Sequence, residues 1–223
     1  MRVAILSSGG KDSTYAHWWA TLQGWDVLAL IRCKISDSDS MMFQIPATDI
    51  VEKQCIASNT EYIEFLLSGK EDLEIDELYS EIVNNISQKG ILEGLEGLIT
   101  GALRSDYQKT RIERMCAKLN IKSFSPLWHN CPKVHMNSLI DEGFEIMISS
   151  VSCNGLDESW LGKVLCLESY KDLEKLAGKF RFNVDGEGGE YETTVINAPH
   201  FSHTIECKKE KVWNKSRGYV KFI

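Results

Sequence analysis

Long apolar runs are missing from this chain of 223 residues. The longest uninterrupted ones reach about five residues, whereas a helix that crosses a bilayer needs about 20, so we expect no membrane-spanning segment. The apolar run at residues 3–6 turns polar at Ser7 and is too short for the core of a signal peptide. These absences lead us to expect a cytoplasmic protein.

Paired cysteines and an excess of positive charge are also missing. The seven cysteines are an odd number and form no CxxC pair, which argues against a disulfide framework, a zinc ribbon and a thioredoxin-like pair. Lysine and arginine number 25 against 32 aspartate and glutamate residues. Because neutralised phosphates supply much of the affinity of nucleic-acid binders, we expect no stable nucleic-acid binding. The apolar share of 43% excludes a disordered chain.

What is present over residues 1–125 is an alternation of strand and helix patterns. The clearest helix has apolar residues at Ile75, Leu78, Ile82 and Ile86, which line one face. The predicted strands are residues 2–6, 26–31, 61–66, 97–101 and 122–125, and the predicted helices are residues 13–23, 48–59, 75–86 and 106–119. This order predicts right-handed βαβ units and a doubly wound parallel sheet. Ligands of such sheets bind at the carboxyl ends of the strands.

The pattern changes after Pro126. Helices are predicted at residues 133–142 and 171–176, and strands at residues 145–151, 204–208, 211–213 and 218–223. We therefore expect an α/β protein with two domains: a doubly wound domain over residues 1–125 and a smaller α+β domain over residues 126–223.

The sharpest local motif is the segment of residues 7–13, SSGGKDS, between the first strand and the first helix. Its adjacent glycines let backbone N–H groups converge on an anion, and the helix N-terminus adds partial positive charge. The Walker A pattern is absent. A carboxylate beside polyphosphate is repelled unless a cation lies between them, so Asp12 points to Mg²⁺. The alternative is a tight turn in which Asp12 or Ser13 caps the helix.

Four blocks of the sequence resemble the motifs of one family. Residues 8–13 (SGGKDS) resemble the signature of the ATP-pyrophosphatase, or PP-loop, enzymes, which cleave ATP between its α- and β-phosphates. Residues 101–111 (GALRSDYQKTR), 155–162 (GLDESWLG) and 186–193 (GEGGEYET) resemble the further motifs of the diphthine–ammonia ligase (diphthamide synthase) family. The blocks span most of the chain, and the tail after Phe201 carries none of these motifs.

This resemblance implies a HUP (adenine-nucleotide alpha-hydrolase-like) fold and a ligase that uses ATP. The family amidates the carboxylate of diphthine, a modified histidine of translation elongation factor 2, with ammonium to give diphthamide. The reaction passes through an acyl-adenylate and releases AMP and pyrophosphate, because a carboxylate oxygen leaves poorly until it is adenylated. The protein's task is then positioning and charge neutralisation. The expected partners are the elongation factor and ammonium, and the sequence leaves open whether the chain forms a homo-oligomer.

We expect the four blocks to supply the site. The candidates for nucleotide binding are Ser8, Gly9, Gly10, Lys11, Asp12, Ser13 and Gly101, with Asp12 also the metal ligand. The catalytic candidates are Asp12, Ser105, Asp106, Glu187 and Glu190. Ser105 and Asp106 can equally be an N-cap pair. Glu187 or Glu190 can bind ammonium, act as its general base, or lie in a solvated loop.

The candidates for substrate binding are Asp157, Glu158, Trp160, Gly188, Gly189 and Tyr191. Diphthine carries a trimethylammonium group, and aromatic faces hold such cations. Trp160, Tyr191 and Trp128 are therefore candidates for an aromatic cage, with ordinary packing as the alternative. The five histidines show no metal-ligand spacing, and we expect them to be structural or exposed.

Two rival functions stay open at the level of the sequence. A tRNA-modifying PP-loop enzyme usually brings an RNA-binding module or a reactive cysteine pair, and this acidic chain without CxxC shows neither. A non-catalytic adenine-nucleotide sensor needs the phosphate loop but not the carboxylates of the second domain. Pyrophosphate release that depends on ammonium and on the modified elongation factor distinguishes the ligase from the sensor.

Overall fold

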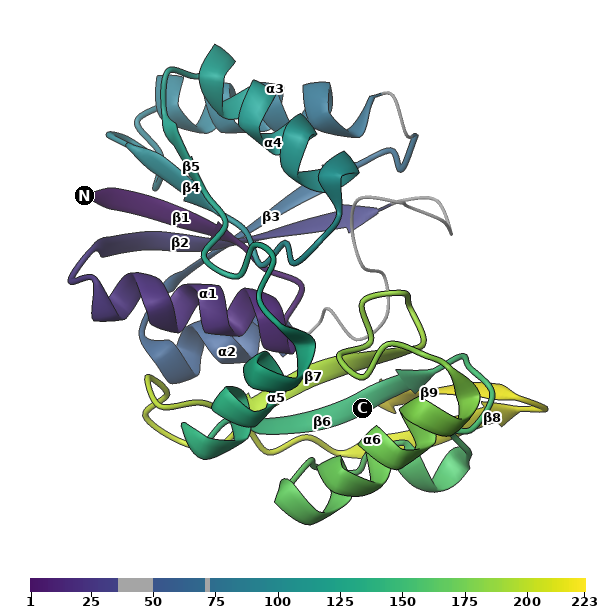
Figure 1. Ribbon diagram of the computed structural model, residues 1–223. Coiled ribbons are helices and arrows are strands. Elements are labelled where there is room, and N and C mark those ends of the chain that lie inside the picture. The colour runs from purple at the N-terminus through teal and green to yellow at the C-terminus, as the bar shows by residue number, and fades with distance from the viewer. Residues whose placement is uncertain (36–49, 71–72) are drawn as a thin grey trace.

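A parallel sheet of five strands, in the order β3-β2-β1-β4-β5, forms the N-terminal part of the chain (Figure 1). The computed structural model describes residues 1–35, 50–70 and 73–223. The strands are β1 (Arg2–Leu6), β2 (Asp26–Ile35), β3 (Glu61–Leu67), β4 (Gly97–Ile99) and β5 (Lys122–Phe124). The helices are α1 (Lys11–Leu22), α2 (Ile50–Ser58), α3 (Glu74–Ser87) and α4 (Asp106–Lys118). The predicted doubly wound α/β fold is confirmed.

Both faces of this sheet are buried, because helices cover each of them. Helices α1 and α2 lie on one face and α3 and α4 on the other (Figure 1). Successive side chains of a strand point to opposite faces. Val3 and Ile5 of β1 accordingly pack with residues of α1 and α2, whereas Ala4 packs with Ile82 of α3 and Met115 of α4. This burial explains why β1, β4 and the middle of β2 are runs of buried apolar residues, whereas the edge strand β3 alternates exposed and buried positions.

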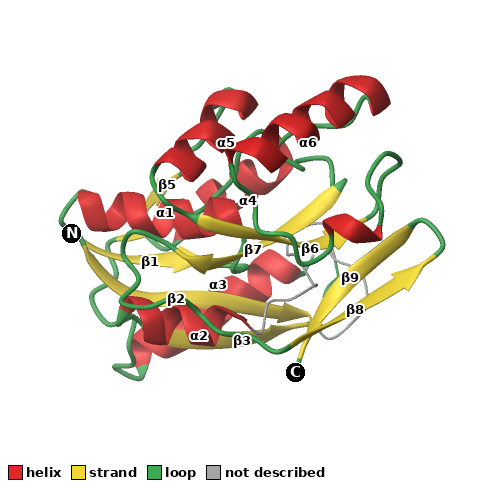
Figure 2. Cartoon of the chain, turned by 90° about the horizontal axis from the view of Figure 1, so that it is seen from below, coloured by secondary structure: helices red, strands yellow, loops and turns green. Residues whose placement is uncertain are grey.

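The C-terminal part is built on a second sheet of four strands, in the order β7-β6-β9-β8. Its strands are β6 (Glu145–Val151), β7 (Tyr191–Asn197), β8 (Lys209–Asn214) and β9 (Arg217–Phe222). Its helices are α5 (Pro132–Asp141), the short 3₁₀ helix η1 (Glu158–Trp160) and α6 (Leu167–Phe180). Figure 2 shows β8 and β9 as a hairpin beside β6. The domain boundary near residue 125 falls between β5 and α5 and stays a prediction.

Three sequence-based expectations for the elements differ from the structure. No strand forms at residues 204–208, and α6 extends beyond the predicted residues 171–176 at both ends. Strand β7 was not expected, although Thr193, Thr194, Val195 and Ile196 are all β-branched, as is typical of strands. The first two positions of the helix expected at residues 48–59 lie outside the described residues.

Helix α1 joins the two parts, because it lies between the two sheets (Figure 1). Ala16 and Ala20 pack against the first sheet with Val3, whereas Tyr15 and Trp18 pack against the core of the second sheet. The phosphate loop at the start of α1 is therefore adjacent to both sheets.

In the part of the chain that the structure describes, no helix has the length and apolar character that a membrane crossing requires.

Candidate active site

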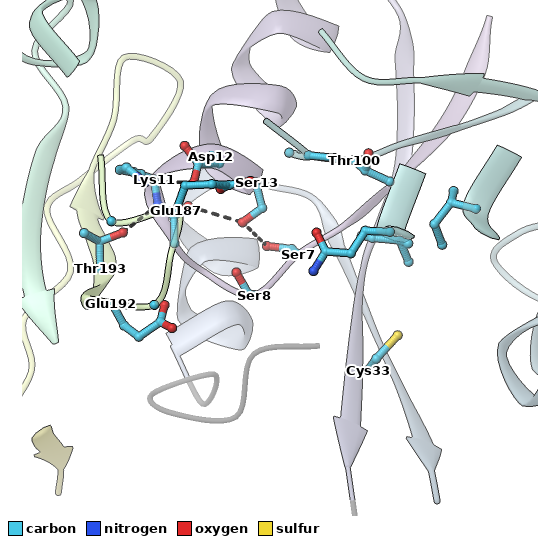
Figure 3. A pocket seen from close by; sticks show the side chains of 18 of the residues that line it. Ser7, Ser8, Lys11, Asp12, Ser13, Cys33, Thr100, Glu187, Glu192 and Thr193 are labelled. Atoms are coloured by element: carbon cyan, nitrogen blue, oxygen red, sulfur yellow. Dashed lines mark hydrogen bonds and ion pairs between the residues drawn. The ribbon is translucent and has the colours of Figure 1, made fainter. Parts of the chain in front are cut away.

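A cavity of about 340 Å³ opens at the carboxyl ends of β1 and β2 (Figure 3). Doubly wound sheets place ligands at this edge. Both parts of the chain line the cavity: Leu6, Ser7, Ser8, Gly10, Lys11, Asp12, Ser13, Ile31, Cys33, Thr100, Gly101, Ala102, Gln108, Ile112, Gly186, Glu187, Gly189, Tyr191, Glu192 and Thr193. The structure thus brings together the first, second and fourth of the sequence blocks and leaves out residues 155–162.

The phosphate loop has the conformation of an anion cradle. Gly9 has φ of 78°, a left-handed conformation that favours glycine, and Gly10 is the N-cap of α1. The Ser13 hydroxyl donates to the Gly10 carbonyl oxygen at 3.2 Å. Among the described residues no partner is found for the backbone N–H groups of Asp12 and Ser13, as is usual for the first turn of a helix. These donors are therefore available to a ligand.

Gly101 lies against the loop itself. A Cβ atom at this position would lie 2.6 Å from the carbonyl carbon of Asp12 and 2.7 Å from the nitrogen of Ser13. The sequence led us to expect that a side chain here obstructs the ligand. The structure shows that it would first displace the backbone that forms the cradle.

Asp12 is held by two partners, one on each oxygen. Its Oδ2 atom lies 2.9 Å from the Lys11 ammonium, and its Oδ1 atom lies 2.8 Å from Nε2 of His135 on α5. Burial by itself would raise the pKa of Asp12, but the Lys11 charge and the His135 hydrogen bond outweigh it and lower the pKa. Burial likewise opposes the charge of Lys11, and Asp12 outweighs it, so the pKa of Lys11 is raised. The pair is therefore charged at neutral pH.

Two further carboxylates face the same cavity from the second part of the chain. Burial, and then the charge of Asp12, raise the pKa of Glu187, although the Arg104 backbone N–H donates to its Oε1 atom at 3.2 Å. Burial raises the pKa of Glu192 to about 7, with Lys11 opposing and Asp12 and Glu187 adding to the rise. The cavity therefore carries negative potential that a bound cation would relieve.

Glu190 is oriented differently from Glu187. Its two carboxylate oxygens accept hydrogen bonds from the backbone N–H groups of Asn183, at 2.7 Å, and Gly188, at 2.8 Å. Both oxygens are thus used to close the loop that precedes β7, and Glu190 does not line the cavity. Of the two glutamates considered for ammonium, only Glu187 borders the cavity. Gly188 is part of the same turn, whereas Gly189 lines the cavity.

The structure does not place the other catalytic candidates at the cavity. Ser105 is the N-cap of α4, where its hydroxyl accepts from the N–H of Gln108 at 3.3 Å, as the capping alternative predicted. Asp106 is the first residue of that helix. Neither residue lines the cavity.

The block at residues 155–162 lies outside the cavity, and its substrate-binding role stays a prediction. Asp157 caps the short helix η1, with Glu158 following it, by accepting from the N–H of Ser159 at 2.9 Å. Trp160 lies in the core of the second sheet, with the Lys163 ammonium 4.2 Å from its ring centroid. These residues do not line the cavity. Tyr191 does line it.

Several residues at the site were not singled out from the sequence. Glu192 and Thr193 belong to the fourth block, and the Lys11 backbone N–H donates to the Thr193 hydroxyl at 3.2 Å. The β-branched residues 193–196 were the available signal, because such residues are typical of strands. His135 carries no local signal, because it reaches Asp12 only through the packing of α5.

The SGGKDS sequence at residues 8–13, between the first strand and first helix of a doubly wound sheet, places the chain in the class of PP-loop α/β proteins. Comparison with family models then identifies the family. Residues 1–123 match the diphthamide synthase N-terminal domain, and residues 131–223 match the diphthamide synthase C-terminal domain. The chain belongs to the diphthamide synthase family, as its sequence motifs predicted.

Curated relatives agree with this assignment. The chain is 32% identical over 249 residues to the diphthine–ammonia ligase of Bos taurus, covering all of this chain and 91% of that protein. It is 31% identical over 240 residues to the diphthine–ammonia ligase of Schizosaccharomyces pombe, of which it spans 39%. A solved structure described as a predicted subunit of a tRNA methyltransferase from Methanocaldococcus jannaschii aligns with 89% of this chain and 98% of its own. Its TM-score of 0.45 and identity of 16% are too low to bear on function.

Proposed function

We propose that this protein is a diphthine–ammonia ligase that uses ATP to amidate the diphthine carboxylate of translation elongation factor 2 with ammonium. One observation carries the proposal. The cavity sets an anion-binding loop, residues 7–13, opposite two carboxylates, Glu187 and Glu192, whose pKa values are raised by burial and by the charge of Asp12 despite the opposing charge of Lys11. A triphosphate fits the first surface, and ammonium, the cation that yields the nucleophile ammonia on losing a proton, fits the second. The names of the curated relatives support the same reaction.

Different parts of the cavity lining are suited to the phosphates and to the adenine ring of ATP. The N–H groups at the start of α1 and the hydroxyls of Ser8 and Ser13 are suited to the phosphates. Ile31, Cys33 and Ile112 also line the cavity and belong to one apolar cluster, which is suited to the adenine ring. A volume of about 340 Å³ is at the lower end of the range for sites that bind small molecules.

The residues present also fit Mg²⁺, with Asp12 as the protein ligand. No group of three potential side-chain ligands occurs in the described residues. A magnesium ion bound to a nucleotide typically takes one or two carboxylates and completes its shell with phosphate oxygens and water. When bound, the ion supplies positive charge that neutralises the phosphates. The charge of Asp12 contributes to the raised pKa values of Glu187 and Glu192, and this repulsion supports such a cation.

The reaction needs two displacements. The diphthine carboxylate oxygen attacks the α-phosphorus of ATP, the bond to the β-phosphate oxygen breaks, and pyrophosphate leaves. Ammonia then attacks the carbonyl carbon of the acyl-adenylate, the bond from that carbon to the AMP oxygen breaks, and AMP leaves. Ammonium must first lose a proton, and a carboxylate whose pKa lies near neutral pH is suited to receive it. Glu192, assisted by Glu187, fits this role better than Glu190.

Mass spectrometry of the elongation factor tests this proposal. The diphthine-bearing factor is incubated with the protein, ATP and ammonium, and the modified peptide is expected to lose the mass difference between OH and NH₂. Reactions without ammonium, and reactions with the Asp12→Asn variant, are expected to leave the mass unchanged. Tight AMP binding without any mass change would instead favour the nucleotide sensor, and retained binding of bulk tRNA at about 0.2 M salt would favour the tRNA-modifying enzyme.

A further inference from the structure

One buried amide connects the phosphate loop to both parts of the chain. The side chain of Gln54 on α2 is 1% exposed. Its Nε2 atom donates to the Gly9 carbonyl oxygen at 2.9 Å and to the Val195 carbonyl oxygen of β7 at 2.8 Å. The Gly9 oxygen also accepts from the Val195 N–H at 3.0 Å. Helix α2, the phosphate loop and β7 thus meet at a single carbonyl group.

The packing around Gly9 leaves this arrangement little freedom. A Cβ atom on Gly9 would lie 2.4 Å from Cγ2 of Ile50 and 3.3 Å from Oε1 of Gln54. Helix α2 is therefore pressed against the loop where the backbone takes its left-handed turn, with φ of 78° at Gly9. The loop cannot move toward α2, and its carbonyl is fixed from the other side by β7.

A fixed Gly9 carbonyl also fixes the next N–H group. The carbonyl and the N–H of a trans peptide point in opposite directions. Because the Gly9 oxygen is directed at Gln54 and Val195, the N–H of Gly10 is directed away from both. Gly10 lines the cavity, and in the described residues its N–H has no protein partner.

We propose that Gln54 is a positioning residue for nucleotide binding. By anchoring the Gly9 carbonyl to β7, it orients the Gly9–Gly10 peptide so that the Gly10 N–H donates to a bound phosphate. The proposal rests on the nucleotide function proposed above, and it adds a residue that lies in none of the four sequence blocks. It also explains why a buried amide is placed among the apolar residues of α2, where its burial is costly without hydrogen bonds.

The substitution Gln54→Met tests this role, because methionine has a similar length and no donor. Each protein is titrated with a non-hydrolysable ATP analogue in the presence of Mg²⁺, and separately with adenosine. We expect the dissociation constant of the variant for the analogue to rise about tenfold, equivalent to about 1.4 kcal/mol. We expect its affinity for adenosine to stay unchanged, because adenosine lacks the phosphates that the Gly10 N–H would contact.

The neighbouring substitution Cys55→Ala is the matched control for stability. Cys55 is buried on the same helix and its thiol donates to the Glu61 carbonyl oxygen at 3.6 Å, so its variant should unfold at a lower temperature and bind the analogue normally. If the methionine variant does not fold, the same titrations are made with Gln54→Asn, whose shorter side chain keeps the amide but holds it farther from the Gly9 carbonyl oxygen. Equal losses for the analogue and adenosine, or no loss for either, would overturn the positioning role. Failure of the unaltered protein to bind the analogue would instead overturn the proposed function.

Discussion

The position of the phosphate loop depends on glycines that pack so closely that an added methyl group would not fit. Gly101 is the clearest case, because an added Cβ would lie 2.6 Å from the Asp12 carbonyl carbon. We expect Gly101→Ala to weaken nucleotide binding at least about tenfold and to lower the free energy of unfolding by about 1–3 kcal/mol. Nucleotide titration and urea unfolding measure the two effects.

Gly178 of α6 provides the matched control for that substitution. Nothing lies within 4 Å of the position that its Cβ would take. Gly178→Ala is therefore expected to stabilise the protein by about 0.5–1 kcal/mol through the helix preference of alanine, with nucleotide affinity unchanged. If the two variants behaved alike, the close approach of Gly101 to the loop would not matter for binding.

Trp160 gives a second prediction at the scale of one residue. The ring is 6% exposed and already faces the Lys163 ammonium at 4.2 Å, so a trimethylammonium group would have to displace another cation. We expect Trp160→Leu to destabilise the protein by about 2–3 kcal/mol and to affect methylated and unmethylated elongation factor equally. A loss confined to the methylated substrate would support the aromatic cage instead.

At the scale of elements, strand β7 and the loop before it give two nearby glutamates different surroundings: Glu192 lies on the strand and Glu190 in the loop. Glu192 on β7 faces the cavity, and burial raises its pKa to about 7. Glu192 is protonated below that pKa and can accept a proton only above it, so amide formation should accelerate between about pH 6 and about pH 8. We expect Glu192→Gln to be slow and to lose this rise, while exchange of pyrophosphate into ATP is largely retained.

Glu190→Gln is the comparison for this prediction. Its carboxylate accepts the N–H groups of Asn183 and Gly188, so we expect the variant to lose stability and to keep the pH dependence of the unaltered protein. A flattened pH profile for Glu190→Gln, with a normal profile for Glu192→Gln, would return the proton-accepting role to Glu190.

The sequence predicted helix α3 well, because its buried residues recur with the helical period. It did not predict strand β7, because a conspicuous motif immediately precedes the strand. Helix α3 was predicted almost to its ends, because Leu78 and Ile82 repeat along one buried face. The acidic, glycine-rich residues 186–190 drew attention away from the strand that follows them. Strand β7 places Glu192 and Thr193 at the phosphate loop. Because this strand was not predicted, these two residues of the site were not predicted either.

At the scale of the whole molecule, the site is formed where distant segments meet. His135 contacts Asp12 across 123 positions of the chain, and Thr193 contacts Lys11 across 182. Spacing in the sequence predicted the anion-binding loop, because its glycines and helix start are adjacent along the chain. It could not predict these partners, because their approach depends on how the second sheet packs on α1.

The same packing predicts how the whole protein responds to acid. His17 on α1 and His200 after β7 are buried together, with His17 Nδ1 and His200 Nε2 3.1 Å apart. Burial lowers the pKa of His17 to about 3, with the neighbouring His200 adding to the shift, and lowers the pKa of His200 to about 4. Both rings are thus neutral in the folded protein well below the ordinary value of 6.5.

These two histidines therefore bind more protons in the unfolded chain than in the folded protein between about pH 6.5 and about pH 3, so their contribution to the free energy of unfolding falls as the pH drops through this window, whereas the raised pKa of Glu192 acts in the opposite direction. We expect urea unfolding of the natural chain to include this histidine contribution between about pH 7 and about pH 5. The double variant His17→Gln, His200→Gln should show a smaller fall, because glutamine does not titrate. Identical pH dependences for the two proteins would mean that the histidine pair is protonated without cost, and that α1 and the segment after β7 separate before the protein unfolds.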